Sequence, residues 1–221
     1  RKMVQFGFQY KAAGVLNTDW GDCGHINFFA GLFHGMILGA ALCWNKESYS
    51  DDVFDRAVSV LEWGDKSETL YMLLRELGRL CFYHFGNIYA WVSSGTEGLW
   101  NKEQKVREIE VGLLQNNYDR AVEIHSELIN LRANSNQRRL EFDELVFGAK
   151  ATVWTLALLL FKKRHEYNQR LEIPVAKAEL IKMGYDVLAE LIRLWRTRNK
   201  ESELQNVVAV FRSALEKVQG L

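Results

Sequence analysis

The chain has 221 residues, of which 48% are hydrophobic, so it can bury a sizeable core in one domain or two. Its 28 basic and 28 acidic residues give a formal net charge of zero. Nucleic acids and anionic membranes are recognised through an excess of positive charge, so this balance argues against both classes of partner.

Apolar residues from Met3 to Ala13 predict a first helix, which Gly14 would end in the left-handed conformation. The helix has no capping residue before it and no initiator Met, which suggests that the chain starts inside a longer protein. The next residues, Val15–Thr18, are typical of a short buried strand. Helix, strand, polar loop and helix in this order are typical of an α/β protein with parallel strands.

The polar loop Asn17–His25 combines an aromatic ring with several hydrogen-bonding groups, which is typical of a site for a polar ligand. The indole of Trp20 offers a flat apolar face to a sugar ring, and the carboxylates of Asp19 and Asp22 can accept hydrogen bonds from hydroxyls. His25 could contact the ligand or hold the loop. From composition alone, a packed tryptophan between helix-capping aspartates is an equally good interpretation.

The helix predicted from Asn27 to Asn45 carries no formal charge between Phe28 and Trp44. Gly31, Gly35 and Gly39 recur at every fourth position, so they share one face, against which another backbone could pack closely. A membrane-spanning helix needs about 20 apolar residues, and the rest of the chain is amphipathic. We therefore expect a buried helix of a protein without a membrane span.

Amphipathic helices dominate the chain after Asn45. Ser50 caps a helix that runs to about Trp63, and a second helix is predicted from Asp65 to about Phe85. Gly86–Asn101 is predicted to be a loop. Further helices are expected at 102–115, 118–133, 137–165, 175–198 and 202–218, with 146–161 as the central core helix, and together they predict an antiparallel helical bundle.

Other polar residues give no pattern typical of a catalytic or metal site. Glu141, Asp143 and Glu144 are expected on a solvated helix face, and His165 at a helix end. His84 and His125 stand alone without ligand spacing. Cys23, Cys43 and Cys81 are expected to be free thiols, which slightly favours a cytoplasmic location. No metal and no cofactor are therefore expected.

The segment Gly14–Asn45 resembles the eighth strand, loop and helix of family 20 glycoside hydrolases, the β-N-acetylhexosaminidases. The resemblance is carried by Gly-Val-Leu-Asn-Thr-Asp-Trp-Gly-Asp, the following Gly-His and the final Gly-Ala-Ala-Leu-Cys-Trp-Asn. Leu194–Asn199 also resembles a segment of the helical tail of bacterial members. These enzymes are (β/α)₈ barrels with the active site at the carboxyl ends of the strands. Trp20-Gly21-Asp22 matches the family's Trp-x-Glu pattern, with Asp in place of Glu.

The resemblance implies that Trp20 forms part of the wall around the bound sugar and that Asp22 binds its hydroxyls at positions 4 and 6. It also implies a retaining mechanism in which the substrate's 2-acetamido oxygen attacks the anomeric carbon. The Asp-Glu pair that orients the amide and supplies the general acid would lie outside this chain. No catalytic residue is therefore expected within it.

The sequence thus predicts a mainly α protein, in which residues 1–49 are the last βα unit of a barrel and residues 50–221 an antiparallel helical bundle domain. Its partners would be a carbohydrate and the remainder of the catalytic barrel. Two alternatives stay open. One is a non-enzymatic helical interaction module, and the other is an all-α enzyme with its site in the aromatic loop 86–100.

Overall fold

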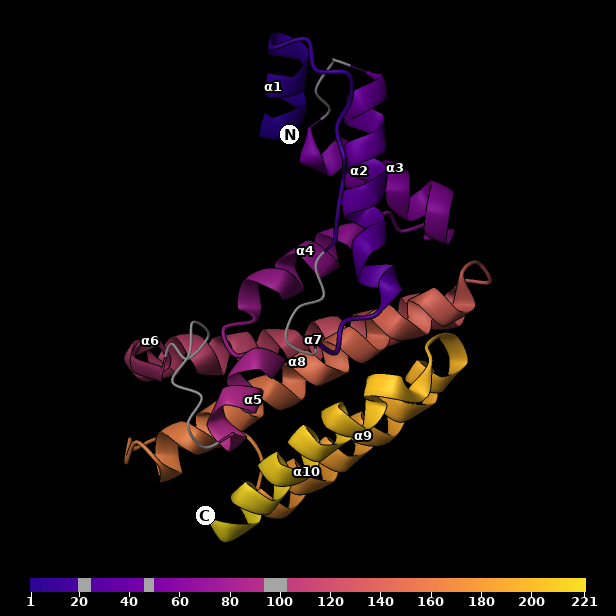
Figure 1. Ribbon diagram of the computed structural model, residues 1–221. Helices are drawn as coiled ribbons and strands as arrows, with labels where there is room; N and C mark the ends of the chain where they lie inside the picture. Colours follow the sequence, from indigo (N-terminus) through magenta and orange to yellow (C-terminus); the bar gives the residue numbers. More distant parts are fainter. Residues whose placement is uncertain (20–24, 46–49, 94–102) are drawn as a thin grey trace.

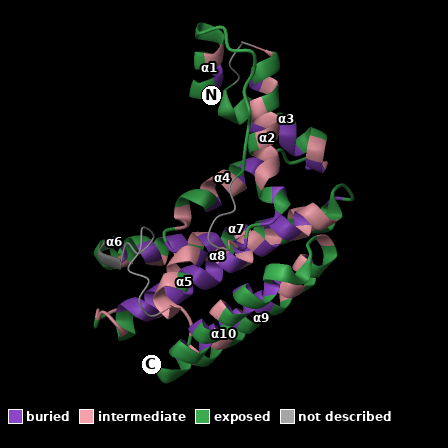
Figure 2. Cartoon of the chain, viewed as in Figure 1, coloured by how far each residue is buried: buried purple, intermediate pink, exposed green. Residues whose placement is uncertain are grey.

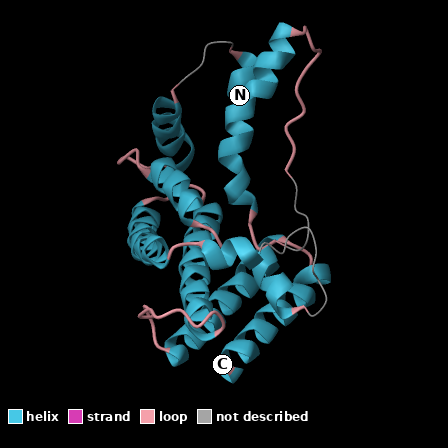
Figure 3. Cartoon of the chain, turned by 90° about the vertical axis from the view of Figure 1, so that its left-hand side faces the viewer, coloured by secondary structure: helices cyan, strands magenta, loops and turns pink. Residues whose placement is uncertain are grey.

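The computed structural model describes residues 1–19, 25–45, 50–93 and 103–221. All regular elements in these ranges are helical, as Figure 3 shows. The α-helices are α1 (Lys2–Gln9), α2 (Phe33–Trp44), α3 (Asp51–Trp63), α4 (Leu70–Leu80), α5 (Phe85–Val92), α6 (Glu103–Glu108), α7 (Val111–Asn134), α8 (Arg139–His165), α9 (Lys177–Arg198) and α10 (Leu204–Gly220), and two 3₁₀ turns are η1 (Phe29–Leu32) and η2 (Glu201–Glu203).

The four long helices α7 to α10 lie side by side and run in alternating directions, with α8 between α7 and α9 (Figure 1). Short connections join α7 to α8 and α9 to α10, and such connections favour antiparallel neighbours. α4 packs on α7, and α5 packs on α10. The predicted helical bundle is confirmed.

Helix α8 forms the centre of the core. Its residues from Val153 to Lys163 are all buried, and Trp154 stacks on Phe211 of α10 with ring centroids 5.1 Å apart. Among the described helices of at least 18 residues, α8 alone is apolar enough to cross a membrane, and 78% of its apolar window is buried inside the molecule. This burial is what a core helix shows, as predicted for residues 146–161.

The predicted helix from Ser50 to about Trp63 is confirmed as α3. The Ser50 hydroxyl accepts a hydrogen bond from the Val53 amide, and Gly64 ends the helix with a φ of 64°. The predicted loop 86–101 is wrong in its first part, because Phe85–Val92 forms helix α5. The remainder of that loop, residues 94–101, lies outside the described residues.

The predicted strand Val15–Thr18 is wrong, and with it the last βα unit of a (β/α)₈ barrel. Residues 15–19 form no regular element, and the described ranges contain no other strand with which they could pair. A strand needs a neighbour to accept and donate its backbone hydrogen bonds. Val15 is 40% exposed and Leu16 87% exposed, so the segment is not buried either.

The end of the first helix also differs from the prediction. α1 ends at Gln9, and Lys11, with a φ of 54°, takes the left-handed position predicted for Gly14. The Ala12 amide then donates to the Gly7 carbonyl over 2.8 Å, which satisfies one of the last helical carbonyls. The left-handed residue therefore lies three positions before Gly14.

The glycine face of α2 meets a side chain instead of a second helix. Nothing lies within 4 Å of a Cβ built on Gly31 or Gly35, whereas a Cβ on Gly39 would lie 2.5 Å from Nδ2 of Asn17. That Nδ2 donates a hydrogen bond to the Gly35 carbonyl over 2.9 Å. The close approach predicted from the spacing exists only at Gly39.

This difference predicts different effects for two similar substitutions in α2. Gly35→Ala should stabilise the chain by about 0.5–1 kcal/mol, because alanine loses less backbone entropy in a helix and the added methyl meets open space. Gly39→Ala should lose this gain, since its methyl would displace Asn17 and break a hydrogen bond worth about 1 kcal/mol. Urea unfolding of both variants measures the difference, and equal stabilisation would contradict the contact with Asn17.

Helices α1, α2 and α3 project from the bundle, and much of α1 is exposed (Figure 2). The base of this projection is nevertheless part of the main core, because Ile26, Phe28 and Ala30 are buried beside α8. Phe28 packs edge-on against Phe147, with 5.3 Å between the ring centroids. The boundary between residues 1–49 and 50–221 remains a prediction from the sequence.

Candidate functional site

Two of the four predicted carbohydrate-binding residues, Trp20 and Asp22, lie outside the described residues. The other two are described. Asp19 is exposed, and His25 is half-buried. Nδ1 of His25 lies 3.1 Å from the Asn27 amide and accepts its hydrogen bond, which places the hydrogen of a neutral ring on Nε2. His25 can therefore donate a hydrogen bond from Nε2.

A buried carboxylate holds the segment that follows His25. Oε2 of Glu144, on α8, accepts a hydrogen bond from the Ala30 amide over 3.0 Å. Oε1 lies 2.8 Å from Nε of Arg198 on α9 and forms an ion pair with it, although the angle is not that of a hydrogen bond. Burial raises the pKa of the Glu144 carboxyl, and the Ala30 amide and Arg198 only partly oppose it.

The expected solvated face of α8 is therefore wrong for Glu144, whose side chain is fully buried. Its neighbour Glu141 bonds to Nη2 of the same Arg198 over 2.9 Å, and Asp143 bonds to Nε of Arg132 over 2.6 Å. The hydrophobic periodicity of α8 could not reveal the burial of Glu144, because the helix is apolar on nearly all sides. The cation that pairs with Glu144 also lies 54 positions further along the chain (198 − 144).

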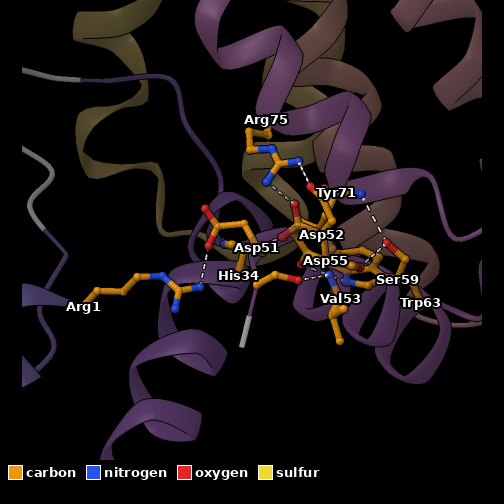
Figure 4. A network of polar contacts seen from close by, with 11 residues as sticks. Arg1, His34, Asp51, Asp52, Val53, Asp55, Ser59, Trp63, Tyr71 and Arg75 are labelled. Atoms are coloured by element: carbon orange, nitrogen blue, oxygen red, sulfur yellow. Dashed lines mark hydrogen bonds and ion pairs between the residues drawn. The ribbon is translucent and has the colours of Figure 1, made fainter. Parts of the chain in front are cut away.

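A second buried carboxylate, Asp55, joins α2 to α3 and α4 (Figure 4). Its Oδ1 lies 2.7 Å from Nε2 of His34, and its Oδ2 lies 3.0 Å from Nη1 of Arg75. The His34 ring packs between Phe54 and Tyr71, with centroids at 5.4 and 4.7 Å. The sequence indicated His34 only as an interruption of an apolar helix.

The hydrogen bonds continue from this cluster into the core. The Ser59 hydroxyl donates to the Asp55 carbonyl and accepts from the Tyr71 amide. Nε1 of Trp63 donates to the Tyr71 hydroxyl over 2.9 Å, and burial raises the pKa of Tyr71 to about 12. Each of these donors and acceptors is hydrogen-bonded to another protein group, so the cluster is suited to holding α2 in place.

Two lysines at the end of α8 are completely buried. Nζ of Lys162 donates to the Tyr83 hydroxyl over 3.1 Å and lies over the ring of Trp91, 4.7 Å from its centroid. Nζ of Lys163 donates to the Arg107 carbonyl over 2.9 Å, and burial lowers its pKa. These contacts tie α5 and α6 to α8. His165 lies exposed at the end of the same helix, as predicted.

The projecting N-terminal part carries a concentration of exposed apolar side chains. We call this set the N-terminal apolar surface; it consists of Met3, Phe6, Phe8, Tyr10, Val15, Leu16 and Trp44. Trp44 is 94% exposed. A cavity of about 150 Å³ opens beside Cys43 and is lined by α1 and the residues after it. Monomeric proteins rarely expose large contiguous apolar surfaces, which mark interaction sites.

The described residues contain no group of three or more His, Cys, Asp and Glu side chains that could hold a metal ion. Cys43 and Cys81 are free, as predicted, and Cys23 lies outside the described residues. No family model, no curated protein and no solved structure matches this chain.

Proposed function

We propose that this chain is a helical part of a glycoside hydrolase that acts on terminal N-acetylhexosamine residues. In this proposal the loop Asn17–His25 contributes to sugar binding through Trp20, Asp22, Asp19 and His25. A catalytic unit outside the chain supplies the Asp-Glu pair, and its apolar surface covers the N-terminal apolar surface. The mechanism is the retaining, substrate-assisted one that the resemblance implies.

The proposal is supported by the position of the most exposed apolar side chains. Among the described large apolar residues, Leu16 and Trp44 have the highest exposed fractions, 87% and 94%, and both lie within Gly14–Asn45, the segment that resembles the glycoside hydrolases. Burying a large apolar side chain stabilises an assembly by about 1.5–3 kcal/mol. A surface of this kind is therefore expected to be covered by another folded unit when the protein is active.

A non-enzymatic helical interaction module is the second candidate. It is favoured by α1, which lies outside the resembling segment and still contributes Met3 and Phe6 to the N-terminal apolar surface. Under this candidate the surface binds a partner protein and the loop binds no sugar. The gene sequence preceding the codon for Arg1 separates the two, because only the hydrolase requires an Asp-Glu dipeptide after an apolar strand.

The chain by itself is expected to bind sugar weakly and to hydrolyse none. A general acid contributes about 10²–10⁴-fold to the rate, and the carboxylate that orients the acetamido group would also be missing. Isothermal titration with N-acetylglucosamine, and an assay with a chromogenic N-acetylglucosaminide, measure the two properties.

Trp20→Ala should abolish the binding of N-acetylglucosamine, and Trp44→Ala serves as the matched control. Turnover of about 1 per second or more by the chain alone would contradict the requirement for an external catalytic pair. Equal binding by wild type and Trp20→Ala would contradict the sugar site and leave the interaction module as the better proposal.

A further inference from the structure

We propose that Glu141, Glu144 and Arg198 form a proton-binding switch, which tightens the attachment of η1 and α2 to the helical bundle as the pH falls. The switch lies where η1 meets α8 and α9. It goes beyond the proposed function, because it depends only on the geometry and the charges of this contact.

The attachment of η1 to α8 depends on a buried carboxylate. Oε2 of Glu144 accepts a hydrogen bond from the Ala30 amide over 3.0 Å, and Phe28, two residues earlier, packs edge-on against Phe147. The Ala30 amide lies in the first turn of η1, where no carbonyl of the same helix can accept its hydrogen bond. η1 continues directly into α2, which extends away from the bundle (Figure 1), so this contact anchors the base of the projecting helix.

Two carboxylates in this contact share one cation. Nη2 of Arg198 donates to Oε1 of Glu141 over 2.9 Å, and Nε of Arg198 lies 2.8 Å from Oε1 of Glu144. Arg138 also acts electrostatically on Glu141, but it is paired with Glu62. η1 itself brings no charged side chain. One negative charge is therefore left without a cation of its own, and such a site binds a proton more readily than an isolated carboxylate in water.

Glu144 is the member of the pair that takes the proton. Its side chain is 0% exposed, whereas that of Glu141 is 21% exposed, and no group among the described residues donates a hydrogen bond to Oε1 of Glu144. Burial raises the pKa of Glu144 by more than the Ala30 amide and Arg198 lower it. Burial also acts to raise the pKa of Glu141, but the hydrogen bond from Arg198 outweighs it, so that pKa lies below its usual range.

The direction of the switch follows from the difference between the attached and the opened state. When η1 opens from α8, water reaches Glu144 and its pKa returns to the ordinary value of about 4.5. The attached state therefore binds the proton more tightly, so its advantage is complete below about pH 4.5 and is lost as the pH rises through the higher pKa of the attached state. Protonation weakens the hydrogen bond from Ala30, but it removes the larger cost of a buried charge and leaves Arg198 paired with Glu141.

The first test is a titration of the side-chain carboxyl carbons of the full chain by ¹³C NMR. Glu144 should titrate above about pH 4.5, and Glu141 below it. Glu141→Gln removes the like charge and leaves Arg198 to Glu144 alone, so Glu144 should then titrate at a lower pH. Asp143→Asn is the matched control, because Asp143 lies on the same helix but pairs with Arg132, and it should leave the titration of Glu144 unchanged.

The second test measures the attachment itself, as the protection of the Ala30 amide from hydrogen exchange relative to its intrinsic rate. Between pH 7 and pH 4.5 this protection should rise at least about threefold in the wild type. It should change little in Glu144→Gln, which carries a neutral acceptor at every pH. Histidine side chains ordinarily titrate in the same interval, and the comparison with Glu144→Gln removes their contribution.

Two results would overturn the inference. Titration of Glu144 at or below the ordinary value for a glutamate would show that the contact does not take up a proton. An equal pH dependence of Ala30 protection in the wild type and in Glu144→Gln would show that the proton does not control the attachment. If Glu144→Gln fails to fold, the titration of Glu144 in the wild type, in Glu141→Gln and in Asp143→Asn still decides the question.

Discussion

Replacing Trp154 by alanine is expected to destabilise the chain by about 3–5 kcal/mol, the usual cost of removing a fully buried aromatic side chain. Trp154 is 0% exposed, stacks on Phe211 and donates from Nε1 to the Leu180 carbonyl over 3.3 Å. It also fills the space at Gly184, where an added Cβ would lie 2.9 Å from Nε1. The ring therefore joins α8, α9 and α10, and urea unfolding measures its contribution.

Trp44→Ala is the matched control for this experiment. The same side chain is removed, but Trp44 is 94% exposed, and its loss should change the free energy of unfolding by less than about 0.5 kcal/mol. Trp154→Phe retains the stacking and should cost less than Trp154→Ala. Comparable losses for Trp44→Ala and Trp154→Ala would contradict the placement of α8 at the centre of the core.

Asp65→Ala is expected to destabilise the chain by about 2–3 kcal/mol at pH 7. Asp65 is 4% exposed and its carboxylate accepts hydrogen bonds from the amides of Ser67, Thr69 and Leu70 at 2.8–2.9 Å, just before and within the first turn of α4. The Ser67 hydroxyl donates to it as well. Removing the carboxylate leaves these donors near the core without an acceptor.

The effect of Asp65 should depend on pH in a defined direction. Burial acts to raise the pKa of the Asp65 carboxyl, but the hydrogen bonds from Ser67, Leu70 and Thr69 outweigh it, so the pKa lies below the usual 3.8. A carboxyl with a lowered pKa in the folded state contributes stability above its unfolded pKa and loses it as the pH falls. The difference between wild type and Asp65→Ala should therefore shrink below about pH 4.

Asp186→Ala provides the comparison for the pH series. The pKa of Asp186 is also lowered, by a hydrogen bond from Lys182 one turn away on the exposed side of α9. An exposed pair of this kind contributes only about 0.3–0.5 kcal/mol. Between pH 7 and pH 3, the difference in urea midpoint from wild type should therefore shrink much more for Asp65→Ala than for Asp186→Ala. Similar changes for the two variants would contradict the buried cap at Asp65.

Local signals in the sequence were sufficient for the elements whose partners are close along the chain. Ser50 predicted the start of α3, since a capping hydroxyl acts on an amide within the same few residues. The apolar run 146–161 predicted the core helix, because a helix without a polar face can be stable only inside. The antiparallel bundle followed from long amphipathic helices with short connections.

Tertiary structure decided the features that depend on distant partners. Val15–Thr18 has the composition of a strand, but in the described residues no second strand is present to pair with it, and it remains an exposed segment seated by Asn17. Gly31, Gly35 and Gly39 share the spacing of a packing face, yet only Gly39 meets another group within 4 Å. Composition and spacing therefore limit which structures a segment can form, and the residues that pack against the segment determine which of them it forms.

The contacts of the buried polar residues were also decided by the tertiary structure. The acidic pattern of α8 did not distinguish Glu144, which is buried against Arg198 and Ala30, from Glu141 and Asp143 beside it. His34 and Asp55 likewise become a pair only when α2 lies against α3. A charge can be buried only where an opposite charge or a hydrogen-bond donor comes close in space, and only the packing of helices distant in sequence brought these groups together.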